Sequence, residues 1–289
     1  MAAKGSFAFV QLEFGFVLGP DDGRYVTRSG PGTAAERVVV ISTLNAPKPA
    51  PRLTRRRRPK QVAGAEAPVM PLARVTMIHA GPFANPADAR SWLGALVTDS
   101  DALHFEVDSA VRDLNRVLRA HRAAASDPYA RDVSAAQAIA VRVGYGDGDQ
   151  VADGNYTDAY EMPRDERRRK RSELLLPNER LAAVLAGRED ILAAEELVLR
   201  ARADVDAGRP REAALQVRVA LEALLAELGA DQLGERRAEI EARRPLAAEA
   251  ANAALAGEVP AELSEAVAET VALLESALAR VRAKQSAGS

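Results

Sequence analysis

Two kinds of hydrophobic pattern divide this chain, and the division limits the folds that it can adopt. The first 80 residues contain four short segments with a strand-like pattern. From residue 178 to the C-terminus, the pattern is that of amphipathic helices rich in Ala and Leu. Strands and helices in separate runs are typical of an α+β architecture. The sequence therefore predicts a small antiparallel β unit packed with helices, followed by an all-α helical domain.

The four strand-like segments are residues 7–18, 24–28, 37–44 and 72–78. In the first, FAFVQLEFGFVL, every second residue is apolar, which predicts a strand that is buried on one face only. The apolar positions are Ala8, Val10, Leu12, Phe14, Phe16 and Leu18. The turn residues GPDDG at 19–23 predict a hairpin that joins the first strand to the second.

Helical signals begin at Asn85-Pro86, where a capping residue is followed by proline. They predict helices over 87–97 and 102–125, and the longer one has an apolar face that should pack on the sheet. That face consists of Val107, Val111, Leu114, Leu118 and His121. Periodicity does not decide between helix and strand for 133–143, and the Gly- and Asp-rich residues 144–154 predict a loop.

The second half of the chain predicts five helices with a break at Pro245. They cover residues 179–186, 190–207, 210–228, 235–256 and 261–284. Apolar residues of the third helix are expected to form a core and a surface for a protein partner or for self-association. These residues are Leu215, Val219, Leu221, Leu224, Leu225 and Leu228.

The helical hairpin around Gly208 and Pro210 resembles one tetratricopeptide unit. It has small or branched residues where that repeat has them, namely Ala201, Ala213, Val217 and Ala220. It departs from the repeat at Arg200 and Asp204, where the pattern has an apolar and an aromatic residue. The chain contains no second copy, whereas such arrays need about three repeats to bury a continuous core.

Composition and charge suggest two domains, as expected for 289 residues. The first combines residues 1–45 and 69–163 around an exposed Arg- and Pro-rich insertion at 46–68, and the second is residues 164–289. From residue 172 onward there are 14 basic and 21 acidic residues, against 25 and 20 before it. A mildly basic first part is therefore followed by an acidic helical domain.

Two arginine-rich tracts suggest binding to nucleic acid or another anionic polymer. The first contains Arg55, Arg56, Arg57 and Arg58, and the second contains Arg167, Arg168 and Arg169 within residues 167–171. Such tracts neutralise phosphates without regard to sequence. Arg112, Arg116 and Arg119 form a further basic stripe along one helix, suited to an anion. The GC-rich codons of Arg, Ala, Gly and Pro offer a different explanation of this arginine content.

One group of side chains has the spacing of metal ligands. Asp101, His104 and Asp108 lie at positions i, i+3 and i+7 of the predicted long helix, where two carboxylates and an imidazole would share a face. This spacing suggests a metal-dependent enzyme as a third hypothesis. The alternative is that the acids at this helix start cap it and complement its dipole.

No catalytic motif accompanies these features. The chain has no cysteine, no Gly-x-Ser-x-Gly elbow and no His-Glu-x-x-His helix, and no membrane-spanning stretch or cofactor is expected. A chain without cysteine fits the reducing cytoplasm. The sequence therefore predicts a soluble, cytoplasmic, non-enzymatic protein-interaction or scaffold module, with anionic-polymer binding as the alternative.

Overall fold

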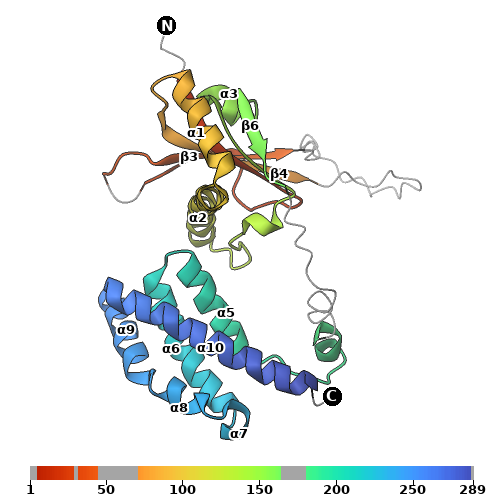
Figure 1. Cartoon of the computed structure of the whole chain (residues 1–289), viewed down its shortest axis with the longest axis vertical. Coiled ribbons are helices and arrows are strands. Elements are labelled where there is room, and N and C mark those ends of the chain that lie inside the picture. Colours follow the sequence, from red (N-terminus) through yellow and green to blue (C-terminus); the bar gives the residue numbers. More distant parts are fainter. Residues whose placement is uncertain (1–4, 29–31, 45–70, 164–179, 288–289) are drawn as a thin grey trace, which may run out of the picture. The chain divides into compact units, whose positions relative to one another are not determined.

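The computed structural model describes residues 5–28, 32–44, 71–163 and 180–287, which form two compact units (Figure 1). The first unit spans Met1–Asp165 and the second Glu166–Ser289. The first contains a six-stranded antiparallel sheet with helices, and the second is helical, which confirms the predicted α+β class. The insertion at 46–68 and both arginine tracts lie outside the described residues.

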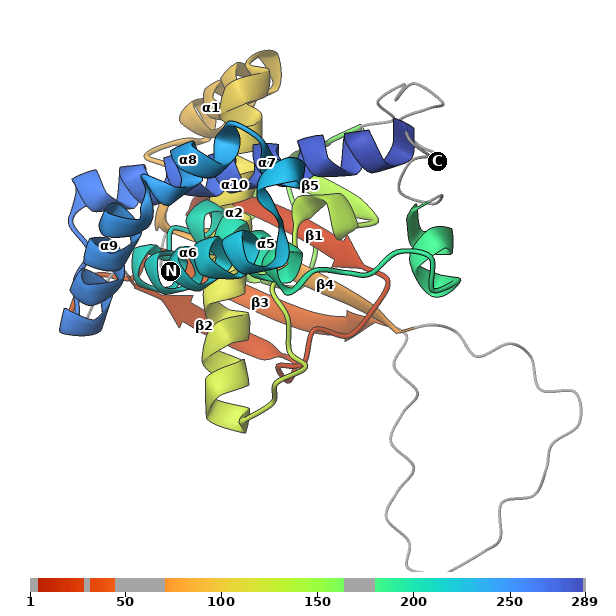
Figure 2. The ribbon, with the colours of Figure 1, turned by 90° about the horizontal axis from the view of Figure 1, so that it is seen from below.

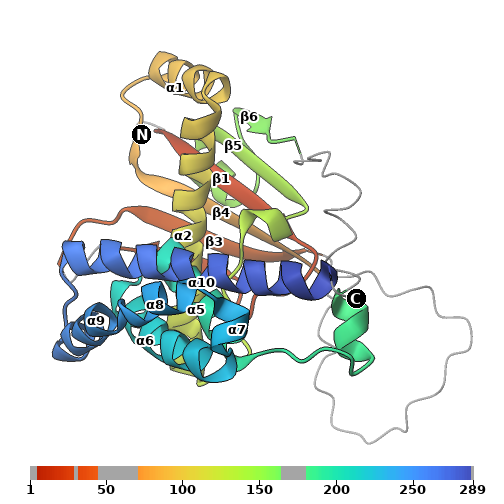
Figure 3. The same cartoon turned by 60° about the horizontal axis from the view of Figure 1, so that its bottom comes forward.

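The sheet has the strand order β2-β3-β4-β1-β5-β6, and all neighbours are antiparallel (Figure 3). The strands are β1 (Ser6–Phe14), β2 (Gly23–Thr27), β3 (Arg37–Leu44), β4 (Leu72–Pro82), β5 (Ala140–Asp147) and β6 (Asp158–Glu161). The first four confirm the four strand-like segments. The segment 133–143, which periodicity left undecided, contains a short 3-10 turn, η1 (Ala135–Gln137), and the start of β5.

Strand β1 differs from its prediction in two ways. It does not form a hairpin with β2, because it pairs with β4 and β5, whereas β2 pairs with β3 alone. It is also buried on both faces, since Phe9 and Gln11 on the face predicted to be exposed are as inaccessible as Val10 and Leu12. The pairing of β1 and its burial have one cause. A strand with large apolar residues on both faces buries the most apolar surface when it lies at the centre of a sheet that is packed on both faces.

Helices α1 (Pro86–Thr98) and α2 (Ser100–Ala125) cover one face of the sheet (Figure 2). Asn85 caps α1, and the Asp99 side chain caps α2 by accepting from two backbone amides. The predicted apolar face of α2 is buried against the even-numbered residues of β1, as expected from its period. This packing forms the main core of the first unit.

The short helix α3 (Gly148–Ala152) packs on part of the opposite face, around Phe9, which corrects the prediction of a loop at 144–154. Gly144 and Gly146 belong to β5 instead of to turns. Both lie where the backbone of the following segment passes close to the sheet. A Cβ on Gly144 would collide with the carbonyl oxygen of Asp158 and lie 2.7 Å from the Cβ of Ala159. These glycines therefore serve close packing of β6.

We expect Gly144→Ala to lower the free energy of unfolding of the first unit by about 1–3 kcal/mol, because the backbone of β6 has to move away. The fluorescence of Trp92, the only tryptophan of the chain, reports this unfolding, since Trp92 and Tyr160 of β6 pack against the same buried cluster. Gly81→Ala in β4 is the matched control, because a Cβ there meets no atom within 4 Å. Equal stability of the two variants would contradict the close-packing role.

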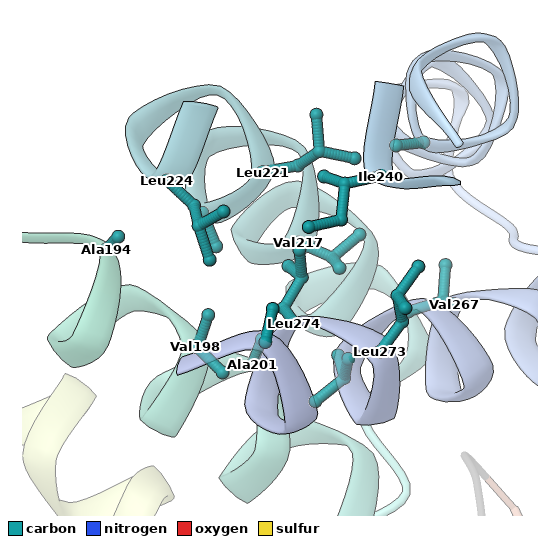
Figure 4. Close-up of a cluster of buried hydrophobic side chains, with 14 of the residues drawn as sticks. Ala194, Val198, Ala201, Val217, Leu221, Leu224, Ile240, Val267, Leu273 and Leu274 are labelled. Atoms are coloured by element: carbon teal, nitrogen blue, oxygen red, sulfur yellow. The ribbon is translucent and has the colours of Figure 1, made fainter. Parts of the chain in front are cut away.

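The second unit is helical throughout its described part. Its elements are a turn of helix at 180–185, α5 (Ala193–Asp206), α6 (Pro210–Glu227), α7 (Ala230–Leu233), α8 (Arg236–Glu241), α9 (Arg244–Ala256) and α10 (Ala261–Ala287). One continuous cluster of buried Ala, Val and Leu side chains forms its core (Figure 4). The predicted break in the fourth helix occurs between α8 and α9, and Pro245 follows it in the first turn of α9.

The tetratricopeptide-like hairpin is formed by α5 and α6, joined at Gly208 with a positive φ of 65°. All four small or branched residues that carried the resemblance are buried in the core. Asp204, at a departure from the repeat pattern, forms an ion pair of 2.6 Å with Arg209. The described helices after α6 have other lengths and do not repeat the hairpin.

Candidate interaction site

A cavity of about 350 Å³ opens at the end of β1 in the first unit. Three segments line it: the residues directly after β1, the residues that follow α2, and η1. The lining residues are Phe16, Val17, Leu18, Gly19, Asp127, Tyr129, Ala130, Arg131, Asp132, Val133 and Gln137. We call this the sheet-end cavity. Its volume lies within the range typical of binding pockets.

Large apolar side chains at this cavity are exposed. Phe16 has 40% of its surface exposed, Val17 54% and Tyr129 82%. The chain has only 4% aromatic residues, so two exposed aromatic rings at one cavity are notable. Leu18 and Val133 are buried apolar residues of the same lining, and we call these two residues the floor of the cavity. Exposed apolar residues grouped around a hollow mark interaction surfaces.

The wall formed by residues 127–133 is held in place by side chains of α2. The Asn115 amide donates to the carbonyl of Val133 and accepts from its N–H, both at 2.8 Å. Arg122 donates to the carbonyl of Ala130 at 3.3 Å. The side chain of Asp127 accepts from the N–H of Tyr129 at 2.9 Å. The cavity is therefore formed before a partner arrives, which reduces the entropy lost on binding.

Gly19 also lines the cavity and has a φ of 108°, a conformation that favours glycine. The His121 ring lies beside it, 3.4 Å from where a Cβ would stand. His121 therefore packs against this turn at the end of the apolar stripe on α2.

A charged network joins α2 to the sheet. The Glu106 carboxylate lies 2.9 Å from the Arg37 guanidinium and 2.7 Å from Nε2 of His79. Arg37 also pairs with Asp113 at 3.4 Å, and Asp113 pairs with Arg116 at 3.5 Å. The side chains of Arg37, Glu106 and Asp113 are almost fully buried. Each carboxylate of this network is bound by cations, so the network holds helix to sheet.

The two buried carboxylates respond differently to these surroundings. Burial raises the pKa of Glu106, but the hydrogen bond to His79 and the charge of Arg37 outweigh burial, so its pKa lies below the ordinary value. Burial also raises the pKa of Asp113, and there the attraction of Arg37 and Arg116 does not outweigh it. Glu106 is therefore charged and Asp113 takes up a proton more readily than a free aspartate.

A second carboxylate of this kind lies in the helical unit. Glu195 in α5 accepts two hydrogen bonds from Arg180, at 2.7 and 2.8 Å, and one from Arg282 of α10 at 2.8 Å. Burial raises the pKa of Glu195, but these two arginines outweigh it and lower the pKa. Glu227 of α6 accepts from the first amides of α5. These contacts tie the ends of the helices together.

The structure does not assemble the predicted metal ligands. Within the described ranges, which include Asp101, His104 and Asp108, no group of three or more His, Asp or Glu side chains could hold a metal ion. The Nδ1 of His104 lies 2.6 Å from the carbonyl of Ser100, one turn earlier in α2. Asp99 and Asp101 occupy the cap and the first turn of α2, as the alternative interpretation expected.

The basic stripe on α2 is engaged by the protein itself. Arg116 donates to the carbonyl of Arg28 at 3.2 Å and to Glu36 at 3.4 Å. The Arg112 guanidinium lies 5.7 Å from the ring centre of Phe105. Arg119 donates to the carbonyl of Asn115 at 3.4 Å. The three side chains thus have separate contacts, and anion binding by them stays a prediction.

The leucine-rich face predicted for partner binding divides into two groups. Leu221, Leu224, Leu225 and Leu228 are buried in the core of the helical unit. Leu215 and Val219 are exposed one turn apart on α6. Neither of these two exposed residues lines the two cavities described for this unit, one formed by α7, α8 and α10 and one around Arg180 and Glu195.

Comparison with protein-family models, with curated proteins and with solved structures gives no match for this chain. Among the described residues, none of the helices has the length and apolar character needed to cross a membrane.

Sequence reasoning missed the residues of the sheet-end cavity. The alternation of β1 predicts that Phe16 lies on the buried face. The strand ends at Phe14 instead, and the ring centroids of Phe14 and Phe16 are 5.4 Å apart. Tyr129 follows an Asp-Pro pair that indicates only the end of a helix. The available signal was an aromatic residue in a turn-rich segment of an aromatic-poor chain.

Proposed function

We propose that this protein is a non-enzymatic interaction module that binds an apolar side chain of a partner protein in the sheet-end cavity. The observation that carries the proposal is the placement of Phe16, Val17 and Tyr129, all exposed, around one preformed hollow. Aromatic residues that surround a pocket are the usual centres of binding energy at protein interfaces. We place this activity in the cytoplasm, because a chain without cysteine needs no oxidising compartment.

The chemistry of the cavity favours a peptide segment of a protein as its occupant. Its floor is apolar, whereas Asp127, Arg131 and Asp132 at the same cavity offer charged groups of both signs. An apolar centre with a polar rim is the ordinary anatomy of a protein interface. The charged rim suits the backbone and polar neighbours of an inserted side chain.

Selection from a displayed peptide library tests this proposal. We expect the full chain to enrich peptides with a large apolar anchor residue. The variant Phe16→Ser/Tyr129→Ser should bind these peptides about 30-fold more weakly, as for the loss of a central interface contact. Tyr129 is largely exposed and Phe16 contributes a ring contact with Phe14, so the variant should stay folded and lose at most about 1.5 kcal/mol of stability.

Phe105→Ser is the matched control, because Phe105 is an exposed aromatic residue that does not line the cavity. It should leave peptide affinity unchanged. Equal affinity of the selected peptides for the wild type and for the double variant would overturn the proposal. Analytical sedimentation of the protein without peptide tests whether the partner is a second copy of this chain. A dimer in the wild type that dissociates in the double variant would identify the second copy as the partner.

Binding of anionic polymers through residues 55–58 and 167–171 remains the alternative. An anisotropy titration of labelled RNA and duplex DNA over a salt series tests it, beside a variant with Arg55–Arg58 changed to Ser. Affinity that falls steeply with salt and weakens in this variant would favour polymer binding over the interaction module.

A further inference from the structure

A second cavity, of about 450 Å³, lies in the helical unit. It is formed by α7, α8 and the last turns of α10. The lining residues are Gln232, Leu233, Arg236, Ala277, Arg280, Ala283 and Lys284. We call it the basic cavity. Three of its residues are cationic and none is acidic, although the chain from residue 172 onward has more acidic than basic residues.

The arginines of this cavity differ from their neighbours. Next to them, Arg237 pairs with Glu241 at 3.0 Å and Arg282 pairs with Glu195 at 2.8 Å. Within the part of the unit that the structure describes, Arg236 and Arg280 have no such carboxylate partner. Lys284 donates only to the backbone carbonyl of Gln232, at 3.4 Å. The cavity therefore gathers positive charge that no ion pair among the described residues neutralises.

Apart from Gln232, the rest of the lining is apolar. Leu233 and Ala277 are buried, and Ala283 adds a small side chain at the rim. A ligand that fits must carry negative charge at one end and a hydrocarbon part at the other. Paired guanidinium groups bind the oxygens of phosphate in a fixed geometry, and a third cation suits a dianion. The volume lies within the range of small-molecule sites.

We propose that the basic cavity binds a small organic phosphate. Its phosphoryl group contacts Arg236 and Arg280, with Lys284 nearby, and its apolar part packs on Leu233 and Ala277. This site is separate from the sheet-end cavity, so the two proposals stand or fail independently.

Phosphorus-31 NMR with the full chain tests the proposal, with hexyl phosphate and inorganic phosphate as probes. We expect the wild type to bind hexyl phosphate more tightly than inorganic phosphate, because only the former reaches the apolar lining. Arg236→Gln/Arg280→Gln should weaken the binding of hexyl phosphate by about tenfold or more, the effect of losing a charge-assisted hydrogen bond. The methyl resonances of Leu233 should shift on titration.

The control is Arg200→Gln/Arg218→Gln, which removes the same charge from exposed positions of α5 and α6 and should leave affinity unchanged. If the first variant does not fold by circular dichroism, Lys284→Gln replaces it. Unchanged affinity in the cavity variant, or equal affinity for the two phosphates, would overturn the proposal. A 20-nucleotide RNA that displaces hexyl phosphate and itself loses affinity in the cavity variant would also overturn it, in favour of a polymer.

Discussion

Replacement of Arg37 by methionine is expected to lower the free energy of unfolding of the first unit by about 3–5 kcal/mol at neutral pH. Arg37 is the cation that binds both buried carboxylates of the network, Glu106 and Asp113. Without Arg37, the buried carboxylates Glu106 and Asp113 lose a cationic partner. Leaving a buried charge poorly paired destabilises a protein by more than the intact ion pair stabilises it. Urea unfolding followed by Trp92 fluorescence measures the effect.

Arg24→Met in the adjacent strand β2 is the matched control. Arg24 forms an ion pair with Asp149, but both side chains are more than half exposed. Such a pair contributes about 0–1 kcal/mol, so the same substitution should change stability little. A loss in Arg37→Met as small as that in Arg24→Met would show that the buried network does not hold α2 to the sheet.

The same variant should change how stability depends on pH. In the wild type, the pKa of Glu106 is lowered, so its contribution is present above the ordinary value of 4.5 and is lost as the pH falls through the folded pKa. Without Arg37, the pKa of Glu106 loses two of the contacts that lower it and so rises, and the pKa of Asp113, already raised by burial, rises further. Protonation of either carboxylate then relieves part of the cost of the missing cation. The stability difference between wild type and variant should therefore be largest near pH 7 and smaller near pH 4.

Leu274→Ala should destabilise the helical unit by about 2–5 kcal/mol. Leu274 is fully buried in α10, in the core that α5, α6 and α9 also form (Figure 4). Truncation removes apolar contacts and leaves a cavity that the helices cannot fully close. This unit contains no tryptophan, so hydrogen exchange of peptides from α6 and α10 measures its stability.

Leu255→Ala in α9 is the matched control, because the Leu255 side chain is exposed. It should leave exchange protection within about 0.5 kcal/mol of the wild type. Similar loss of protection in both variants would mean that α10 does not contribute the core described here.

The fold was predictable wherever one local pattern decided the structure. The four strands and the helices α2, α5 and α6 follow from alternation, helical periodicity and capping residues such as Asp99. Strand pairing was not predictable, because the choice between a β1–β2 hairpin and a central β1 depends on residues 140–147, far along the chain. The role of Gly144 was not predictable either, because it depends on the close approach of the β6 backbone.

The candidate sites could be predicted only in part. The sequence reveals charged tracts and helix-start acids, but a cavity arises from segments that meet in space. Phe16 and Tyr129 are more than a hundred residues apart, and so no local pattern connects them. Arg236 and Arg280 look like their neighbours in the sequence, and only the ion pairs formed by Arg237 and Arg282 distinguish them.

The central position of β1 affects the order in which the first unit can fold during synthesis. Val10 pairs with Met77 on one side and with Val143 on the other. β1 is synthesised before β5. Until β5 has been made, one edge of β1 has no partner and its apolar faces are exposed. Sheets whose paired strands are far apart in sequence fold slowly, and they expose hydrophobic surface until they have folded. We therefore expect the nascent chain of this unit to be prone to aggregation until β5 has been made.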